Sequence, residues 1–253
     1  MNRRDIPALP AGSVNWRTAG DLLLHALWPS RCPVCGEILE FGGPRCHAAC
    51  RQHLTWADSG ICEQCGILLA DPGEHRCSRC TDEIRSFDAG RGVWLHDRIM
   101  AQSIYEFKYA QAAEYARFYA EEMYRLYGDL VRRWEVGLII PVPIHGSKLA
   151  VRGYNQAHLV AREFAKLCKL PEEEHILFRI SQTRAQKGLG RQGRLRSLKK
   201  AFYIPEHISL TGNVLLIDDI YTTGNTMEVC AQRLKERGAR RVYFLTVTTG
   251  SEV

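Results

Sequence analysis

The sequence predicts an α/β protein in which a parallel sheet is flanked by helices and preceded by a small zinc-ribbon domain. Two observations carry this prediction. After roughly residue 90, short apolar runs alternate with amphipathic segments, as in a parallel sheet that is covered on both faces. Before it, eight of the ten cysteines lie between Cys32 and Cys80, which marks a separate unit. We therefore expect a helical segment over residues 1–29, a double zinc ribbon over 30–88 and the sheet domain over 89–253.

Each element of the sheet domain follows from periodicity and from its end signals. The run at 137–142 is apolar and ends in prolines, as a buried strand would, and the amphipathic segment at 155–170 stops before Pro171. The run at 213–218 is the most strand-like in the chain, and Gly238 closes the helix after it. The expected helices are 16–28, 98–109, 112–127 (ending before Gly128), 155–170 and 225–237, and the expected strands are 92–95, 137–142, 175–180, 213–218 and 241–247.

The composition excludes several classes of protein. The 253 residues are 45% apolar and 25% charged, which is ordinary for a globular chain. No run approaches the roughly 18 apolar residues of a membrane-spanning helix. The start of the chain, where Asp5 and Pro7 follow Arg3 and Arg4, lacks a secretory pattern. We expect a cytoplasmic protein, and because thiols stay reduced there, its cysteines are interpreted as metal ligands and not as disulfides.

The cysteine segment repeats with a period of 30 residues, since Cys32-x2-Cys35 recurs as Cys62-x2-Cys65. Two such turns can complete the tetrahedron of a structural zinc. The second copy is complete, with Cys62, Cys65, Cys77 and Cys80.

The first copy leaves its fourth ligand open. His47 stands thirty residues before Cys77, and His47-x2-Cys50 has the spacing of a ligand pair. Cys46 lies beside it, but Cys46-x3-Cys50 is one residue longer, so His47 is favoured and Cys46 stays an alternative. We expect about two structural Zn²⁺ ions. Neither copy resembles an open catalytic site, and residues 1–90 carry nine basic and 11 acidic side chains, which is the wrong sign for phosphate contacts.

The positive charge of the chain is concentrated in one stretch. Arg184–Lys200 holds seven basic residues and no acid, so it should meet a compact polyanion or a nucleic-acid backbone. It contains no Phe, Tyr or Trp, and this absence favours a small polyanion over stacked bases.

The string from Val214 to Thr226 carries the sharpest chemistry. An apolar strand ends in Asp218 and Asp219, and a loop of hydroxyl and glycine residues then leads into a helix. Such a junction directs backbone N–H groups and the positive end of a helix dipole at a phosphate. The two carboxylates can accept hydrogen bonds from ribose hydroxyls or help to hold Mg²⁺ through water.

This string closely resembles the 5-phosphoribosyl 1-diphosphate (PRPP) motif of type I phosphoribosyltransferases. The resemblance extends to the ComF family through Pro141–His145, Arg152–Gln156, the Gln186 to Phe202 stretch and Phe107-Lys108-Tyr109. It implies a type I phosphoribosyltransferase fold behind an N-terminal double zinc ribbon. Two positions depart from the family pattern, which usually has an Asn in place of Ser197 and a second C-x2-C where His47-x2-Cys50 stands.

The resemblance also implies roles for individual residues. Asp218 and Asp219 should be the catalytic carboxylates facing the ribose, and the segment Arg184–Arg196 should be the loop that closes over the substrate. Cations over the diphosphate would stabilise its developing charge. The residues expected to bind PRPP, together with Mg²⁺, are Tyr221, Thr222, Thr223, Gly224, Asn225, Thr226, His145, Arg152, Lys108, Arg184, Lys187 and Arg194.

Two functions follow from the sequence. The first is a Mg²⁺-dependent transferase that moves a phosphoribosyl group from PRPP to an acceptor that the sequence does not identify. The alternative is a non-catalytic protein that senses a nucleotide such as a nucleotide monophosphate, or that handles single-stranded DNA. The ComF resemblance implies a link to DNA uptake during competence, beside a helicase-like partner.

Overall fold

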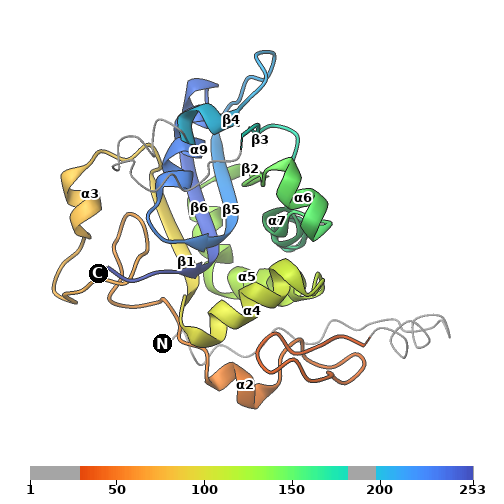
Figure 1. Cartoon of the computed structure of the whole chain (residues 1–253). Coiled ribbons are helices and arrows are strands. Elements are labelled where there is room, and N and C mark those ends of the chain that lie inside the picture. The colour runs from red at the N-terminus through yellow and green to blue at the C-terminus, as the bar shows by residue number, and fades with distance from the viewer. Residues whose placement is uncertain (1–28, 182–197, 253) are drawn as a thin grey trace.

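A four-stranded parallel sheet with the strand order β1-β6-β5-β2 forms the centre of the molecule (Figure 1). The structure is a computed structural model and describes residues 29–181 and 198–252. The two inner strands are almost continuously buried because helices cover both faces of the sheet. The strands are β1 (Ala89–Leu95), β2 (Val136–Pro141), β5 (Asn213–Tyr221) and β6 (Arg241–Thr249), and a separate antiparallel pair is formed by β3 (Phe178–Arg179) and β4 (Phe202–Tyr203).

The sheet separates the core into two halves, each covered by its own helices. Alternate side chains of β5 enter different halves, because successive side chains of a strand point to opposite faces. Leu215 and Ile217 pack with α4 (Arg98–Tyr109), α5 (Tyr115–Arg133) and α7 (Gln156–Cys168). Val214 and Leu216 pack with α9 (Asn225–Glu236). The short α6 (Gly146–Arg152) follows β2. No helix of the described segments combines the length and the apolar composition needed to cross a bilayer.

The two zinc-ribbon repeats join different halves of the core. The first, which contains α2 (Ala48–Gln52), contributes Cys32 and Leu54 to the α4–α5–α7 half. The second, which contains α3 (Ser78–Asp82), contributes Cys62 and Ile67 to the α9 half. Between them the chain runs along the edge of β1, where the backbone N–H of Ala57 donates to the carbonyl of Val93 over 3.0 Å. The first repeat therefore extends the core on one face of the sheet, and the second repeat extends it on the other face.

Most elements lie where periodicity predicts them, and the helix at 98–109 has the predicted bounds. The helix expected at 112–127 is wrong at both ends, because it begins at Tyr115 and runs through Gly128 to Arg133. Tyr127 and Val131 are both about 1% exposed, and their packing outweighs the poor helix propensity of glycine between them. The expected helix over 16–28 lies outside the described residues.

Two strands also differ from their predicted lengths. The strand expected at 175–180 shortens to β3, of two residues, while β5 continues past Asp218 to Tyr221. The backbone of β5 stays paired with β6 over this extension, where Tyr221 lies opposite Thr249. The carboxylates therefore belong to the paired strand and do not lie in the loop after it. The helix α6 was not predicted, because its seven residues lack an apolar stripe.

Candidate active site and zinc clusters

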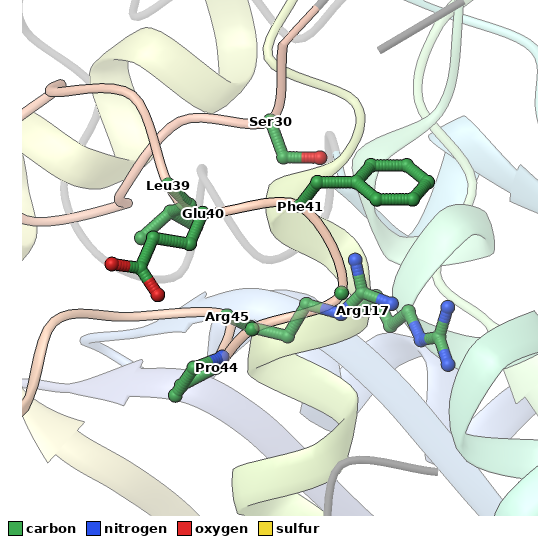
Figure 2. Close-up of a pocket in the computed structure, with 9 residues that line it drawn as sticks. Ser30, Leu39, Glu40, Phe41, Pro44, Arg45 and Arg117 are labelled. Atoms are coloured by element: carbon green, nitrogen blue, oxygen red, sulfur yellow. The ribbon is translucent and has the colours of Figure 1, made fainter. Parts of the chain in front are cut away.

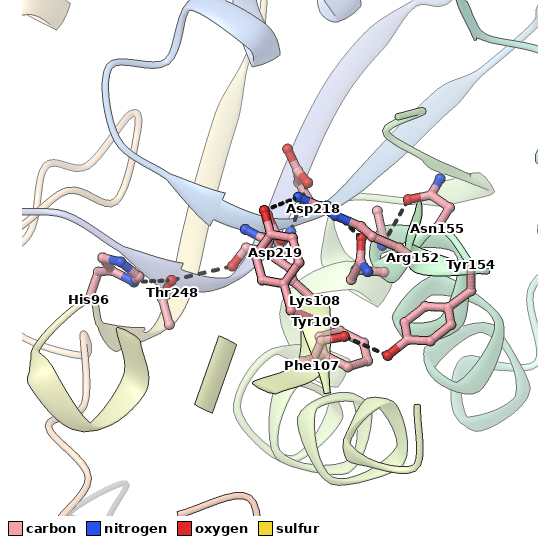
Figure 3. A network of polar contacts seen from close by, with 12 residues as sticks. His96, Phe107, Lys108, Tyr109, Arg152, Tyr154, Asn155, Asp218, Asp219 and Thr248 are labelled. Atoms are coloured by element: carbon pink, nitrogen blue, oxygen red, sulfur yellow. Dashed lines mark hydrogen bonds and ion pairs between the residues drawn. The ribbon is translucent and has the colours of Figure 1, made fainter. Parts of the chain in front are cut away.

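Two adjacent carboxylates lie near the carboxyl end of β5, and that of Asp219 contacts helix α4 (Figure 3). Lys108 Nζ lies 2.6 Å from Asp219 Oδ2, and the backbone N–H of Asp219 donates to Asp218 Oδ1 over 2.8 Å. Burial, followed by repulsion from the charge of Asp219, raises the pKa of Asp218 well above its usual range. The pair therefore holds one carboxylate in an ion pair and a second that favours a proton, or a ligand that donates to it.

The chain turns sharply after β5. Gly224 has a φ of +75°, a left-handed conformation that suits glycine, and α9 begins at the next residue. No described side chain caps the start of α9, and Thr222 and Thr223 are exposed beside it. Asn225 Oδ1 is buried without a hydrogen-bond partner. The loop, Thr222–Thr226 (hereafter the phosphate loop), thus offers uncapped N–H groups and hydroxyls of the kind that bind an anion.

Four cationic side chains gather at this end of the sheet, on α4, on α6 and on β3. Lys108 and Arg152 were expected, whereas Lys148 and Arg179 were not. Burial lowers the pKa of Lys148, and the nearby charges of Arg152 and Arg179 lower it further. Burial also lowers the pKa of Arg179, and the charge of Asp218 acts in the opposite direction. The cluster has the sign and density that a ligand with several phosphate charges requires.

The sequence held only weak signals for the two missed cations. Lys148 follows the expected turn at His145 by three residues, and Arg179 lies in the expected strand at 175–180. The sequence alone does not show that either residue joins this cluster, because each belongs to an element whose place depends on contacts with distant segments.

The motif Arg152–Gln156 ties three elements together at this end of the sheet. Asn155 Nδ2 donates to the carbonyl of Val142 over 3.1 Å, and the hydroxyl of Tyr154 donates to the carbonyl of Phe107 over 2.6 Å. Arg152 Nη2 donates to the hydroxyl of Tyr109 over 2.9 Å, and its guanidinium carbon lies 4.9 Å from the centre of that ring. These bonds fix α6 and α7 against α4.

The turn after β2 lies beside the carboxylates, because β2 pairs with β5 and Pro141 is opposite Ile217. His145 ends this turn, and its Nδ1 accepts the backbone N–H of Ser147 over 3.2 Å at the start of α6. The structure thus brings the turn, the carboxylates and the phosphate loop to one edge of the sheet, as expected for carboxyl ends of parallel strands.

Some of the expected ligand-binding residues are placed differently or are not described. The side chain of Tyr221 is 3% exposed and stacks on Phe244 with ring centres 4.8 Å apart, so it points into the core. Only its backbone can face a ligand. Arg184, Lys187 and Arg194 lie in residues 182–197, outside the described residues. The other expected residues line the carboxyl edge of the sheet.

The second cysteine cluster forms as its spacing predicts. The backbone N–H of Cys65 donates to the Sγ of Cys62 over 3.5 Å, and α3 begins directly after Cys77. The four sulfurs, which lie within 4.8 Å of one another and are all buried, belong to Cys62, Cys65, Cys77 and Cys80. Four converging thiols with no open position fit a structural zinc.

The first cluster groups Cys32, Cys35, His47 and Cys50, whose ligand atoms also lie within 4.8 Å of one another. His47 precedes α2 with φ and ψ of −60° and 138°, close to the −69° and 157° of Cys77 before α3. Cys46 is outside this group, and its Sγ lies 3.7 Å from that of Cys32. The geometry favours His47 as the fourth ligand, which stays a prediction.

A separate pocket lies between the first ribbon and α5, and Arg45 and Arg117 line it (Figure 2). Burial lowers the pKa of Arg45, and the charge of Arg117 adds to the effect. Glu40 lines the same pocket. None of its lining residues belongs to the carboxyl-edge site.

Comparisons with known proteins agree with this architecture. Residues 23–81 match the double zinc ribbon domain family, and residues 150–252 match the phosphoribosyl transferase domain family. The ribbon match supports structural zinc at the two clusters. Together with the parallel sheet, the matches confirm the predicted fold class.

Relatives extend over most of the chain. It is 27% identical over 223 residues to competence protein F of Haemophilus influenzae, covering 81% of this chain and 96% of that protein. It is 24% identical over 208 residues to competence protein ComFC of Bacillus subtilis, covering 82% and 72%. A solved purine phosphoribosyltransferase of Pyrococcus horikoshii is 17% identical, with a TM-score of 0.31, over 57% of this chain and 91% of that one. The two named competence proteins confirm the family resemblance of the motifs.

Proposed function

We propose that this member of the ComF family binds PRPP with Mg²⁺ at the carboxyl end of β5 and transfers its phosphoribosyl group to an acceptor. One observation carries the proposal. A carboxylate pair, an uncapped glycine turn at a helix start and four cations converge at one edge of a parallel sheet. That combination fits a ligand with a sugar between two phosphate groups. The names of the relatives support a role of this chemistry in competence.

Different elements would bind different parts of PRPP. Backbone N–H groups of the phosphate loop would hold the 5′-phosphate, and Asp218 and Asp219 would accept hydrogen bonds from the ribose hydroxyls. Arg152 and Lys148 lie on α6, directly after the turn at Pro141–His145, and would face the diphosphate. Mg²⁺ would neutralise diphosphate charge and support its departure.

Chemistry at this site needs stabilisation of charge at two positions. The bond between ribose C1 and the diphosphate oxygen breaks, the diphosphate leaves with the electron pair, and the acceptor forms the new bond to C1. Positive charge that develops on the ribose lies near Asp218 and Asp219, and negative charge on the diphosphate lies near Lys148 and Arg152. Preorganised groups of opposite sign at both ends lower the barrier.

Replacing the carboxylates tests the proposal. We expect Asp218→Asn and Asp219→Asn each to weaken PRPP binding by about 100-fold, or about 2.7 kcal/mol, measured by calorimetry with Mg²⁺. Wild-type protein that binds no PRPP, or variants that bind it as well as wild type, would contradict the proposal.

Asp218→Asn should also change the pH dependence of stability. The raised pKa of Asp218 means that its contribution is fully present below the ordinary pKa of an aspartate and is lost as pH rises through the raised value. Above that value the buried, ionised side chain costs stability. We expect Asp218→Asn to increase the free energy of unfolding at pH 7 and to flatten its decline with pH, in denaturant titrations. A variant less stable than wild type at pH 7 would contradict this.

One observation favours the alternative function, the handling of single-stranded DNA. Tyr105 and Tyr109 are 58% and 53% exposed, with ring centres 5.1 Å apart, beside the cations of the site. Exposed aromatic rings next to cations suit stacked bases and their phosphates. Arg184–Lys200 contains no aromatic residue, whereas these two rings come from α4.

The two functions separate in one experiment. Fluorescence anisotropy with a labelled oligothymidine at two salt concentrations measures DNA binding. Binding that falls steeply with salt, weakens about tenfold in Tyr105→Ala and survives Asp218→Asn would support DNA handling. Binding of PRPP that is lost in Asp218→Asn and kept in Tyr105→Ala would support the transferase.

A further inference from the structure

The second zinc ribbon is hydrogen-bonded to the phosphate loop and to the helix that follows it. Arg79, in α3, donates from Nη1 to the carbonyl of Thr222 over 3.5 Å. At the other end of the loop, the carboxylate of Glu228 accepts the backbone N–H of Ser86 over 3.0 Å and its hydroxyl over 2.6 Å. Glu228 lies in the first turn of α9, and its own backbone N–H donates to the carbonyl of Gly224. The start of the loop and the first turn of the helix that follows it are therefore both bonded to the ribbon segment.

The last residues of the described chain add a second set of bonds. The backbone N–H of Gly250 donates to the carbonyl of Tyr221, and the carbonyl of Gly250 accepts the N–H of Leu68 from the ribbon. Ser78, next to the cysteine ligand pair of α3, donates from its backbone and hydroxyl to Glu252 over 2.8 and 2.7 Å. These bonds link the start of the loop to the second cluster through the backbone.

Tyr221 fills the space between the loop and the second cluster. A Cβ atom placed on Gly224 would lie 2.4 Å from the hydroxyl of Tyr221, so the loop backbone rests directly on that hydroxyl. The ring stacks on Phe244 and meets Phe87 edge-on. Tyr221 belongs to the same buried half of the core as the four cysteines of the second cluster, so it packs between them and Gly224.

The first cluster has no equivalent connection. Its ribbon meets α5, where Arg51 contacts Glu122, and no hydrogen bond within residues 29–181 and 198–252 joins it to the phosphate loop. A hydroxyl of similar burial does lie near it, since Tyr115 donates to Glu106 Oε2 over 3.0 Å and lies 3.4 Å from the carbonyl of Cys32. That hydroxyl supports a helix and not a loop, which makes it a matched control.

We propose that Tyr221 and Glu228 are positioning residues through which the second zinc cluster sets the shape of the phosphate loop. A bound zinc would fix the four cysteines of the second cluster, so Tyr221, which packs in the same half of the core, would keep its hydroxyl beneath Gly224. The loop keeps the backbone conformation that presents its N–H groups only while the second cluster is filled. The inference rests on the proposed function for its ligand, PRPP, but the loop's order is measurable without any ligand.

Hydrogen exchange on the zinc-loaded full chain gives that measurement. In Tyr221→Phe, which keeps the ring and removes the hydroxyl, we expect peptides covering 222–228 to exchange about tenfold faster than in wild type, with two zincs retained. Glu228→Gln should speed exchange in the same peptides. Tyr115→Phe should leave them unchanged. Equal exchange in Tyr221→Phe and Tyr115→Phe would overturn the proposal.

Cobalt in place of zinc supplies a spectroscopic test of the same connection. The thiolate-to-cobalt absorption of the second cluster should shift in Tyr221→Phe and not in Tyr115→Phe, because only Tyr221 packs in the half of the core that holds the second cluster. The affinity of Tyr221→Phe for PRPP should be about tenfold lower than that of wild type. If wild type binds no PRPP, the proposed function fails, while the exchange and cobalt results still decide the role of Tyr221. An unshifted absorption in Tyr221→Phe would overturn the proposal.

Discussion

The two zinc ribbons are copies of one unit that have come to support different parts of the molecule. Gly36 and Gly66 share φ values of 75° and 73°, and both clusters place a ligand directly before a short helix. The four candidate ligands of the second copy are buried, whereas Cys35 of the first is exposed. The first copy packs with α4, α5 and α7, and the second packs with α9 and the phosphate loop. A repeated metal-binding unit therefore takes its role from the surface against which it packs.

The ribbon interfaces differ as much as their positions do. The first is held by a charged group, in which Glu122, 9% exposed at its side chain, accepts from Arg51 and Arg125. The second is held by backbone bonds and by contacts beneath Gly224. Disrupting the first interface should therefore loosen the packing of α5, while disrupting the second should weaken ligand binding.

The largest difference is expected when a ligand is removed from each cluster. Cys65→Ser should lose one zinc and reduce PRPP binding by at least about 100-fold, because the phosphate loop loses its support. Cys35→Ser should lose one zinc and keep PRPP affinity within about threefold. Metal analysis and calorimetry on both variants make this comparison. Equal loss of PRPP affinity in the two variants would show that the ribbons are not specialised.

A second difference concerns stability without a change in ligand binding. Glu122→Gln removes the charge that two arginines share, and breaking one partner of a largely buried ion pair costs roughly 3–5 kcal/mol, with less expected here because Arg51 is partly exposed. We expect the free energy of unfolding to fall by about 2–3 kcal/mol, measured with urea. Arg117→Gln, which disrupts an exposed pair with Glu121 on the same helix, should cost under about 1 kcal/mol. Loss of PRPP affinity in folded Glu122→Gln would contradict the separation of roles.

The order of zinc release gives a third, smaller difference. A chelator reaches a metal through its exposed ligands, and only the first cluster has an exposed one, Cys35. One equivalent of zinc should therefore leave at least about tenfold faster than the other, followed with a zinc-binding dye. PRPP affinity should persist after the first equivalent leaves. A single release phase for both zincs would contradict the difference in burial.

Much of this architecture was predictable, because it depends on local patterns. The period of 30 residues located both clusters, and the strand–carboxylate–glycine string located the phosphate loop. The rest depends on contacts between distant segments. Lys148 and Arg179 join Lys108 only because α6 and β3 lie close to α4 in the folded chain. Tyr221 was expected at the ligand, yet its side chain packs in the α9 half of the core, although strict alternation after Ile217 would turn it to the other face.

The smallest expected effect concerns the residue that the repeat left ambiguous. Cys46 packs in the core at 5% exposure and contacts Cys32, but its sulfur lies outside the first ligand group. Cys46→Ala should therefore keep two zincs and lower the free energy of unfolding by only about 1 kcal/mol, the cost of a small buried side chain. His47→Ala should lose one zinc, and His47→Cys should keep it, because the equivalent position of the second ribbon is Cys77. Metal analysis of the three variants separates the two assignments. If Cys46→Ala lost the zinc and His47→Ala kept it, the first ribbon would not be a geometric copy of the second, and the comparison between them would lose its basis.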